Sequence, residues 1–279
     1  MKKIFAFLLA LCACAALFSQ QTVTDTSTPS TQTRQTANVT YPANMVLVEG
    51  GTFQMGSTNG DSDERPVHTL TVKTFYMGKY EVTQKEWKEV MGNNPSEFKG
   101  DNLPVERVSW YDAIEYCNKR SQREGLTPVY RGSKNKIICD WSADGYRLPT
   151  EAEWEFAAKG GIKGYLTTEY SGSKNVGTVA WYDINSGSKT HPVGTKEPNA
   201  LGLYDMSGNV WEWCWDLYGN YQSGNQTDPR GASSGANHVV RGGSWDSTAR
   251  SVRSASRNYN DPSDRRNGFG GIGFRLVRN

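Results

Sequence analysis

Apolar and polar positions follow a period of two in the first part of the chain and predict β-strands there. An apolar run at 45–48, a Gly-Gly pair and an alternating run up to Gly56 predict a strand, a tight turn and a second strand. Residues 56–66 are polar and acidic, so we expect a loop. Alternation from His68 to Tyr80 predicts one further strand.

Three later stretches change to helical spacing, and each begins with a capping sequence. Thr83 and Glu86 have the spacing of a capping box, and the helix that follows is expected to stop at Gly92. Similar starts and glycine stops predict helices over 109–125 and 150–161. We interpret the acidic residues of the first turns as caps that suit the helix dipole, and not as acid/base catalysts. Few periodic stretches and no internal repeat follow, which indicates a single domain.

The first 19 residues have the pattern of an export signal. Two lysines precede an unbroken apolar run over 4–18, which is too short to span a bilayer. Leu11 and Ala13 ahead of Cys14 resemble a lipoprotein signal, in which Cys14 becomes the acylated N-terminus. Cleavage after Ser19, which would release a free protein, is the alternative.

Residues 20–43 are rich in Ser, Thr and Gln and contain almost no apolar residue. Such a segment cannot bury enough surface to offset its ordering entropy, so we expect a flexible tether ahead of a domain over 44–279. The chain is therefore predicted to be exported, as a cell-surface or outer-membrane lipoprotein or, alternatively, as a periplasmic or secreted protein. Contact with a membrane would be through the lipid anchor only.

Composition narrows the class of protein. Of 279 residues 29 are Gly, about one in ten against roughly 7% in average proteins. Only 22% are charged, the mean hydropathy is −0.66 and the net charge is +2. These values argue against a coiled coil, a protein of many membrane spans and a disordered chain. A near-neutral chain also argues against nucleic acid as a partner, and we expect a monomer.

Cysteine and histidine positions do not indicate a zinc or iron site. Behind the leader the sequence has three cysteines, so at most one disulfide can form and its pairing stays open. The cysteines are Cys117, Cys139 and Cys214. The three histidines are far apart in sequence and are interpreted as structural or exposed side chains; they are His68, His191 and His238.

Three separated blocks carry a family resemblance. They are Arg147–Glu155 (RLPTEAEWE), Gly202–Trp213 (GLYDMSGNVWEW) and Arg241–Trp245 (RGGSW), followed by Gly273–Val277 (GFRLV). In this order they resemble the formylglycine-generating-enzyme (sulfatase-modifying factor) family over about 44–279. The resemblance implies a compact α+β fold, poor in regular secondary structure and related to C-type lectins.

The same resemblance implies that oxidase chemistry is missing. Oxidases of the family use two cysteines that bind copper(I) downstream of the Arg-Gly-Gly-Ser-aromatic block, and the matching positions here are Ser247 and Val252. Copper(I) prefers soft sulfur ligands, which neither residue offers, and no cysteine follows Cys214. An iron-dependent branch takes its histidines from an additional helical domain that does not match this chain. We expect a protein without copper that is not an enzyme, whereas an enzyme with relocated catalytic residues is the alternative.

The segment 246–272 is where the function is expected. From Arg241 to Asn279 the chain has eight Arg and three Asp, a local charge of +5. Tyr and Arg anchor recognition surfaces, and Ser, Asn and Gly add adaptable hydrogen bonds. The placement is similar to the variable proteins of diversity-generating retroelements, whose C-terminal segment changes to bind new ligands, although plain family members have similar termini. The resemblance implies a displayed protein that binds a protein or glycan, on a host or neighbouring cell.

Candidate binding residues are those expected to project from loops of this segment. They are Asp246, Ser247, Arg250, Ser256, Tyr259, Asn260, Asp261, Arg266, Asn267 and Phe269. The residues that match the family framework are expected to be structural, with the arginines paired to Asp or Glu of the earlier blocks. They are Arg241, Gly242, Gly243, Arg253, Gly273 and Arg275.

Calcium is the one metal that the resemblance supports. The ligands would be the side chains of Asn209 and Glu212 with the carbonyls of Gly208 and Val210, an oxygen set that suits a hard cation. In the alternative, Asn209 caps a turn and Glu212 pairs with an arginine. A second family site is matched only loosely, by Asn175, Val176 and Asp183.

Overall fold

The computed structural model describes residues 44–164, 168–265 and 271–279. The predicted export signal with Cys14, the predicted tether and the candidates Arg266, Asn267 and Phe269 therefore lie outside the described residues. The helices are α1 (Gln84–Met91), α2 (Trp110–Arg123), α3 (Glu151–Ala158) and α4 (Val176–Val179), with 3-10 turns at Ser62–Glu64, Lys134–Lys136 and Gly161–Lys163. The strands are β1 (Met45–Val48), β2 (Gly51–Met55), β3 (His68–Val72), β4 (Phe75–Gly78), β5 (Tyr130–Arg131), β6 (Ile138–Cys139), β7 (Trp211–Leu217), β8 (Gln226–Thr227), β9 (His238–Arg241), β10 (Arg257–Asn260), β11 (Ile272–Gly273) and β12 (Val277–Arg278).

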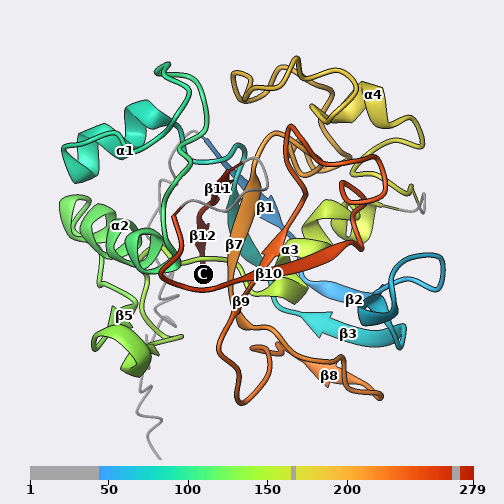
Figure 1. Ribbon diagram of the computed structural model, residues 1–279. Helices are drawn as coiled ribbons and strands as arrows, with labels where there is room; N and C mark the ends of the chain where they lie inside the picture. Colours follow the sequence, from blue (N-terminus) through green and yellow to red (C-terminus); the bar gives the residue numbers. More distant parts are fainter. Residues whose placement is uncertain (1–43, 165–167, 266–270) are drawn as a thin grey trace, which may run out of the picture. The chain divides into compact units, whose positions relative to one another are not determined.

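The strands form small sheets in the orders β1-β4-β12, β10-β9-β7-β11, β2-β3-β8 and β5-β6. Helices α1 and α2 lie together on one side of the β9 and β7 strands, and the β2–β3 ribbon lies on the other (Figure 1). This mixture of short strands and few helices confirms the α+β, C-type-lectin-like class with little regular structure.

The first strands differ from their prediction in pairing. The alternating segment 68–80 is two strands, and the strands of the Gly-Gly region do not pair with each other: β1 pairs with β4 and β2 with β3. The break lies where Gly50 donates its N–H to Thr74 Oγ1 at 2.9 Å. A Cβ on Gly50 would lie 2.6 Å from the Val72 carbonyl oxygen, so close contact of the two backbones needs glycine there.

The helix starts are confirmed, because each predicted cap forms both halves of a capping box. Thr83, Ser109 and Thr150 accept from the third residue of their helix, whose carboxylate accepts from the cap in return. Helix α1 ends at Gly92 with a φ of 78°, the left-handed conformation that glycine adopts readily. Helices α2 and α3 end two residues before the predicted glycine stops.

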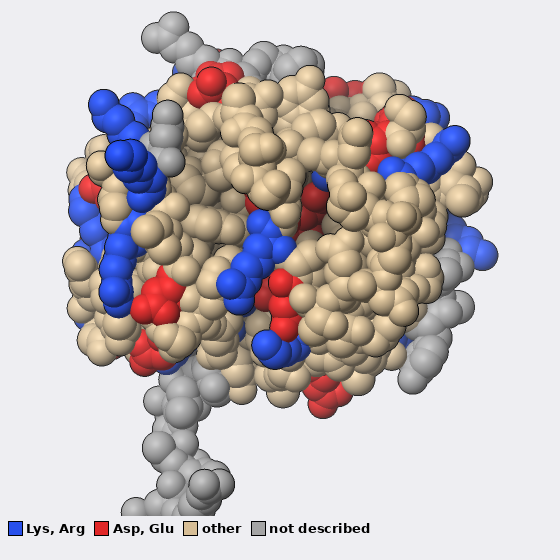
Figure 2. Space-filling view, turned by 90° about the horizontal axis from the view of Figure 1, so that it is seen from below, with Lys and Arg blue, Asp and Glu red and all other residues tan. Residues whose placement is uncertain are grey.

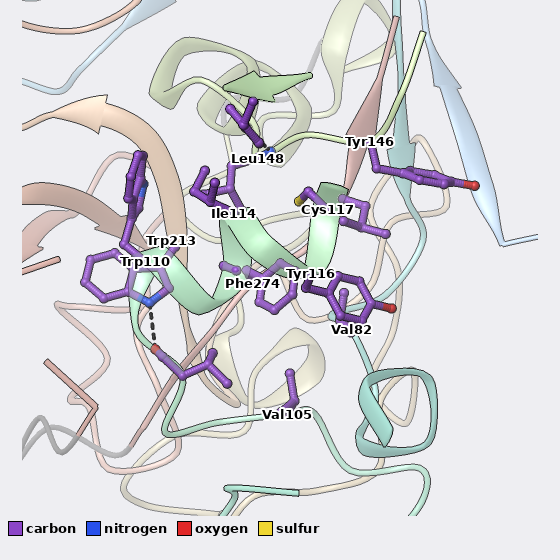
Figure 3. Packing of buried hydrophobic residues seen from close by; sticks show 14 of the residues in the cluster. Val82, Val105, Trp110, Ile114, Tyr116, Cys117, Tyr146, Leu148, Trp213 and Phe274 are labelled. Atoms are coloured by element: carbon purple, nitrogen blue, oxygen red, sulfur yellow. Dashed lines mark hydrogen bonds between the residues drawn. The ribbon is translucent and has the colours of Figure 1, made fainter. Parts of the chain in front are cut away.

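Helix α2 and the C-terminal strands form one hydrophobic core. Ile114 and Tyr116 of α2 face Trp213 of β7 and Phe274 in Figure 3. The Tyr116 ring lies parallel to Trp87 of α1, with a centroid distance of 5.4 Å. The tryptophans Trp154 and Trp213 of the sequence blocks are fully buried and belong to the core.

All three cysteines behind the leader are buried free thiols, so the described residues contain no disulfide. Burial raises the pKa of the Cys139 thiol to about 12 and that of Cys214 well above its ordinary value. Such thiols stay protonated and are poor metal ligands or nucleophiles. Within the described ranges, none of the helices has the length and apolar character required to cross a membrane.

Candidate functional site

The C-terminal segment runs along the edge of the central sheet. The chain leaves β9 at Arg241, makes a loop over 242–256, and returns as β10, which pairs antiparallel with β9 so that Arg257 faces Arg241 (Figure 1). Alternate residues of β10 point to opposite faces, so Arg257 and Tyr259 share one face. This segment contains both the family framework and the candidate binding residues.

The framework arginines meet buried carboxylates. Arg241 pairs with Glu155 of α3, which lies in an earlier sequence block as predicted. Arg253 instead donates to Glu64 at 3.0 Å, a residue of the acidic loop and of no block. A further pair, not predicted, joins Arg257 to Glu151, where two nitrogens donate at 2.6 and 2.8 Å. These side chains are almost fully buried, and a buried guanidinium requires such partners.

Among the described residues, the arginines of this segment therefore do not form a free cationic surface. Even exposed arginines are paired: Arg250 contacts Asp61 at 2.6 Å, and Arg265 contacts Asp112 at 2.6 and 2.7 Å. Figure 2 shows one face of the molecule, on which acidic and basic side chains lie beside each other among uncharged residues. The carboxylates come from the predicted acidic loop and from helix first turns, which the sequence could not assign to partners.

The predicted binding residues divide by exposure. Asp246, Arg250, Tyr259 and Asp261 are exposed, and two are half-buried; the half-buried ones are Ser247 and Asn260. Ser256 was expected to project from a loop, and this is wrong, because its side chain is 3% exposed. The reason is the buried Arg241 guanidinium, which donates to the Ser256 carbonyl and holds this turn against the protein.

Tyr259 is the most prominent of these side chains. It is 49% exposed, and its ring lies 4.4 Å from that of Tyr218. The Tyr218 hydroxyl donates to Asp63 at 2.7 Å, and Asp61 of the same turn holds Arg250. This chain of contacts joins Tyr259 to Arg250, so the structure connects the loop 242–256 and strand β10 along one strip of surface.

An aromatic groove of about 850 Å³ adjoins this strip, and Asp261 and Ser263 form part of its wall. Its other walls come from the start of α2, from β7, and from the loop after β8; the aromatic residues are Trp110, Tyr111, Trp215 and His238. Trp110 and His238 are stacked at 3.9 Å, and the Trp110 indole donates to the Cys214 carbonyl at 2.9 Å. Burial lowers the pKa of His238 to about 4, so this imidazole is uncharged at neutral pH.

Sequence reasoning missed these groove residues. Trp110 lies at a helix start and Trp215 in a strand, and both have the spacing expected of core residues. Only the fold brings them to a shared surface next to Asp261. Nothing in the sequence distinguishes them from tryptophans of the core.

The positions that match the oxidase cysteines are filled by other contacts. Ser247 Oγ accepts from the Ser244 N–H at 3.0 Å and lies 3.0 Å from Ser244 Oγ. Val252 is fully buried with Val179 and Ala180. A hydroxyl in a turn and an isopropyl group in a core offer no soft donor to copper(I).

The predicted calcium ligands are occupied by protein groups. Both Glu212 oxygens accept from Arg275 at 2.6 Å, and Oε2 also accepts from the Trp154 indole at 2.8 Å. Asn209 donates to Glu81 at 2.7 Å and accepts from the His191 N–H at 2.9 Å. Glu212 thus follows the arginine alternative. As they lie, these groups do not fit a cation, since a guanidinium occupies the carboxylate; calcium binding itself stays a prediction.

Two residues of the second, looser calcium set make contacts within the protein, and calcium binding there stays a prediction. Asn175 caps the short helix α4 by accepting from the Gly177 N–H at 3.0 Å, and Asp183 donates its N–H to the Ser247 carbonyl at 3.1 Å. Over the described residues, the His, Cys, Asp and Glu side chains form no group of three or more that could hold a metal ion.

Comparison with known proteins places this geometry in context. The family model described as "Sulfatase-modifying factor enzyme 1-like domain" matches residues 30–279. "Chaperone protein LppX" from Paenibacillus barcinonensis is 44% identical over 274 residues, which cover 86% of this chain and 91% of that protein. "Formylglycine-generating enzyme" from Streptomyces coelicolor is 29% identical over 303 residues, which cover 83% and 88%.

Among solved structures, "Treponema denticola variable protein 1" is similar, with a TM-score of 0.77 and 37% sequence identity over 84% of this chain and 94% of that one. Relatives of this scaffold thus include a named enzyme, a named chaperone and a named variable protein. On the family match over most of its length, the chain belongs to the formylglycine-generating-enzyme (sulfatase-modifying factor) family.

Proposed function

We propose that this protein is an exported binding protein, displayed at the cell surface, which uses the family scaffold without oxidase chemistry. Its ligand-binding surface consists of the exposed residues of the C-terminal segment together with the aromatic groove beside them. The partner is a protein, and a glycan is the alternative that the test must separate.

The observation that carries this proposal is the half-exposed Tyr259 beside an open groove with aromatic walls. Tyrosine and tryptophan supply much contact area at low entropic cost and dominate the binding energy of interfaces. A further apolar side chain, Ile138, is 69% exposed on the strand next to the groove residue Ile137. An exposed isoleucine at the margin of such a surface favours a protein partner over a sugar.

The relatives support the same proposal. A protein named as a chaperone acts on other proteins, and a variable protein with this fold is 37% identical to the chain. Ser247 and Val252 replace the two copper ligands, which supports the absence of catalysis. Diversification by a retroelement is the narrower form of this proposal.

A site-specific photo-crosslinker tests the binding surface. In producing cells, p-benzoylphenylalanine at Tyr259 or Asp261 is expected to give a discrete protein adduct of one mass. The matched control is the same group at Ile162, which is 41% exposed and lines neither the groove nor the strip. Equal labelling from all three positions would overturn the proposal, and an adduct that a glycosidase removes would indicate a glycan.

An oxidase assay tests the absence of catalysis. Purified protein loaded with copper is given a Cys-containing peptide under air, and formylglycine is measured by mass spectrometry. We expect no product above a copper-only control. Turnover would mean that catalytic residues have moved elsewhere in the chain.

Sequencing of the gene in sibling isolates tests diversification. Substitutions are expected at exposed positions such as Asp246, Arg250 and Tyr259, while the buried Arg253 and Arg257 stay unchanged. Changes spread evenly over the gene would exclude this form of the proposal.

A further inference from the structure

A second cavity, of about 660 Å³, lies next to the aromatic groove and has a charged floor. Leu217 and Ala232 line both cavities and separate them. The floor carries Glu151, Asp216 and Arg257, each less than a tenth exposed. Buried ionisable groups on the floor of an open cavity are uncommon in a purely structural region.

Two of the three charged floor groups satisfy each other. Arg257 donates twice to Glu151, at 2.6 and 2.8 Å, and also to the carbonyls of Asp63 and Gly219. The Tyr221 hydroxyl adds a bond to Glu151 at 3.3 Å. This pair has no bonding capacity directed at a ligand.

Asp216 differs, because no cation contacts it. One oxygen accepts from the Glu151 N–H at 2.9 Å and so holds the start of α3. The other oxygen, Oδ1, makes no hydrogen bond to any described residue, and Asp216 lines the cavity. Burial and the nearby Glu151 charge raise the pKa of Asp216 well above its ordinary value. The ionised form of a carboxyl that is 3% exposed is therefore costly, and a bound cation would stabilise it.

One side of Asp216 is covered by backbone. Gly231 packs against it with a φ of +85°, and a Cβ there would lie 2.6 Å from the Asp216 Cβ. A ligand would therefore approach from the cavity, whose rim includes the polar, uncharged side chains of Gln222, Gln226 and Ser234. The cation of the cavity floor, Arg257, is bound to Glu151.

We infer that this cavity binds a basic side chain of the partner, a lysine ammonium or an arginine guanidinium, which pairs with Asp216 Oδ1. The inference rests on the proposed function, because the cavity adjoins the proposed binding surface and would receive a side chain from a protein docked there. A cation supplies the charge that the site lacks, and the rim amides and hydroxyls can accept its remaining N–H groups.

Small probes test this directly on the full chain. N-acetyl-arginine amide and N-acetyl-lysine amide are titrated while amide shifts are followed by NMR. N-acetyl-citrulline amide is the neutral match of the arginine probe, and methyl glucoside represents a sugar. We expect at least a fivefold preference for the charged probes. Equal binding of citrulline, or binding of the glucoside alone, would overturn the inference.

Two variants locate the effect. Asp216→Asn keeps an acceptor for the Glu151 N–H and is expected to weaken charged-probe binding at least tenfold, whereas Asp101→Asn, on the surface beside Lys88, leaves it unchanged. Ser234→Arg adds a cation to an exposed rim position, so it should fold normally and lower the affinity at least fivefold. Ser234→Gln is its uncharged control. Full binding by folded Asp216→Asn and Ser234→Arg proteins contradicts the inference.

The probe experiment and the crosslinking experiment can fail independently of each other. If crosslinking at Tyr259 succeeds while the probes fail, only the basic-side-chain inference is wrong. If the probes bind through Asp216 while no position crosslinks a partner, the surface proposal is wrong and the cavity serves free amines.

Discussion

The buried framework arginines and the exposed binding strip come from the same C-terminal segment and have similar composition, yet they differ in how their charges are satisfied. Arg241, Arg253 and Arg275 each lie against a carboxylate inside the protein. Arg250 holds its carboxylate in solvent, and Tyr259 exposes half of its ring. Burial thus fixes the identity of the framework residues, whereas the strip can change sequence at little cost to the fold.

The largest expected effect is the loss of a framework arginine. Arg275→Ala leaves the Glu212 carboxylate buried without a cation, so we expect the free energy of unfolding to fall by about 3–5 kcal/mol. Urea denaturation followed by tryptophan fluorescence measures this. A fall of less than about 1 kcal/mol would mean that Glu212 is neutral or rehydrated and that the framework is weaker than its geometry indicates.

The second effect concerns binding rather than stability. Tyr259→Ala is expected to weaken partner binding by about 30-fold, the size of an aromatic hot spot, while unfolding changes by less than about 1 kcal/mol. Ile162→Ala is the control for loss of an exposed apolar side chain. Affinity and the free energy of unfolding are measured for both variants, with the crosslinked partner as ligand. If Tyr259→Ala lowers stability together with affinity, the distinction between the exposed strip and the buried framework is wrong.

The third prediction uses a carboxyl that lacks the close ion pairs of the framework. Although burial opposes it, Lys159 and Arg241 hold the pKa of Glu155 below its ordinary value. Burial instead raises the pKa of Glu106 to about 7 from 4.5. The folded state therefore binds the proton of Glu106 more tightly than the unfolded state does. The stabilisation from this protonated carboxyl is full below pH 4.5 and is lost as the pH rises through 7. Glu106→Gln should flatten that part of the stability profile, measured as melting temperature from pH 4 to 8; an unchanged slope would exclude Glu106 as its source.

The smallest effect is expected at the exposed pair. Both side chains of Arg250 and Asp61 are more than half exposed, at 59% and 55%. Solvent screens such a pair, so Arg250→Ala should not change the melting temperature measurably. Arg253→Ala, three residues away but buried against Glu64, provides the contrast and should lower it clearly.

Local features of the fold could be predicted from the sequence, and long-range ones could not. A capping box closes within four residues, so Thr83, Ser109 and Thr150 could be assigned with their partners. By contrast, Arg253 and Glu64 lie 189 positions apart, and nothing in the sequence selects one acidic residue over another. The expected single strand over 68–80 failed for a related reason, since its break depends on a contact with Gly50.

The same division holds for the candidate site. The exposure of Tyr259 and Asp261 followed from their position between framework blocks, whereas Ser256 was misjudged because a guanidinium 15 positions earlier holds its turn inward. The sequence by itself determined the family, the helix starts and the replacement of both copper ligands. Only the tertiary structure decided which carboxylate meets each arginine, gathered Trp110, Trp215 and His238 into a groove, and left Asp216 without a cation, because burial and charge pairing are properties of packed surfaces and not of neighbours along the chain.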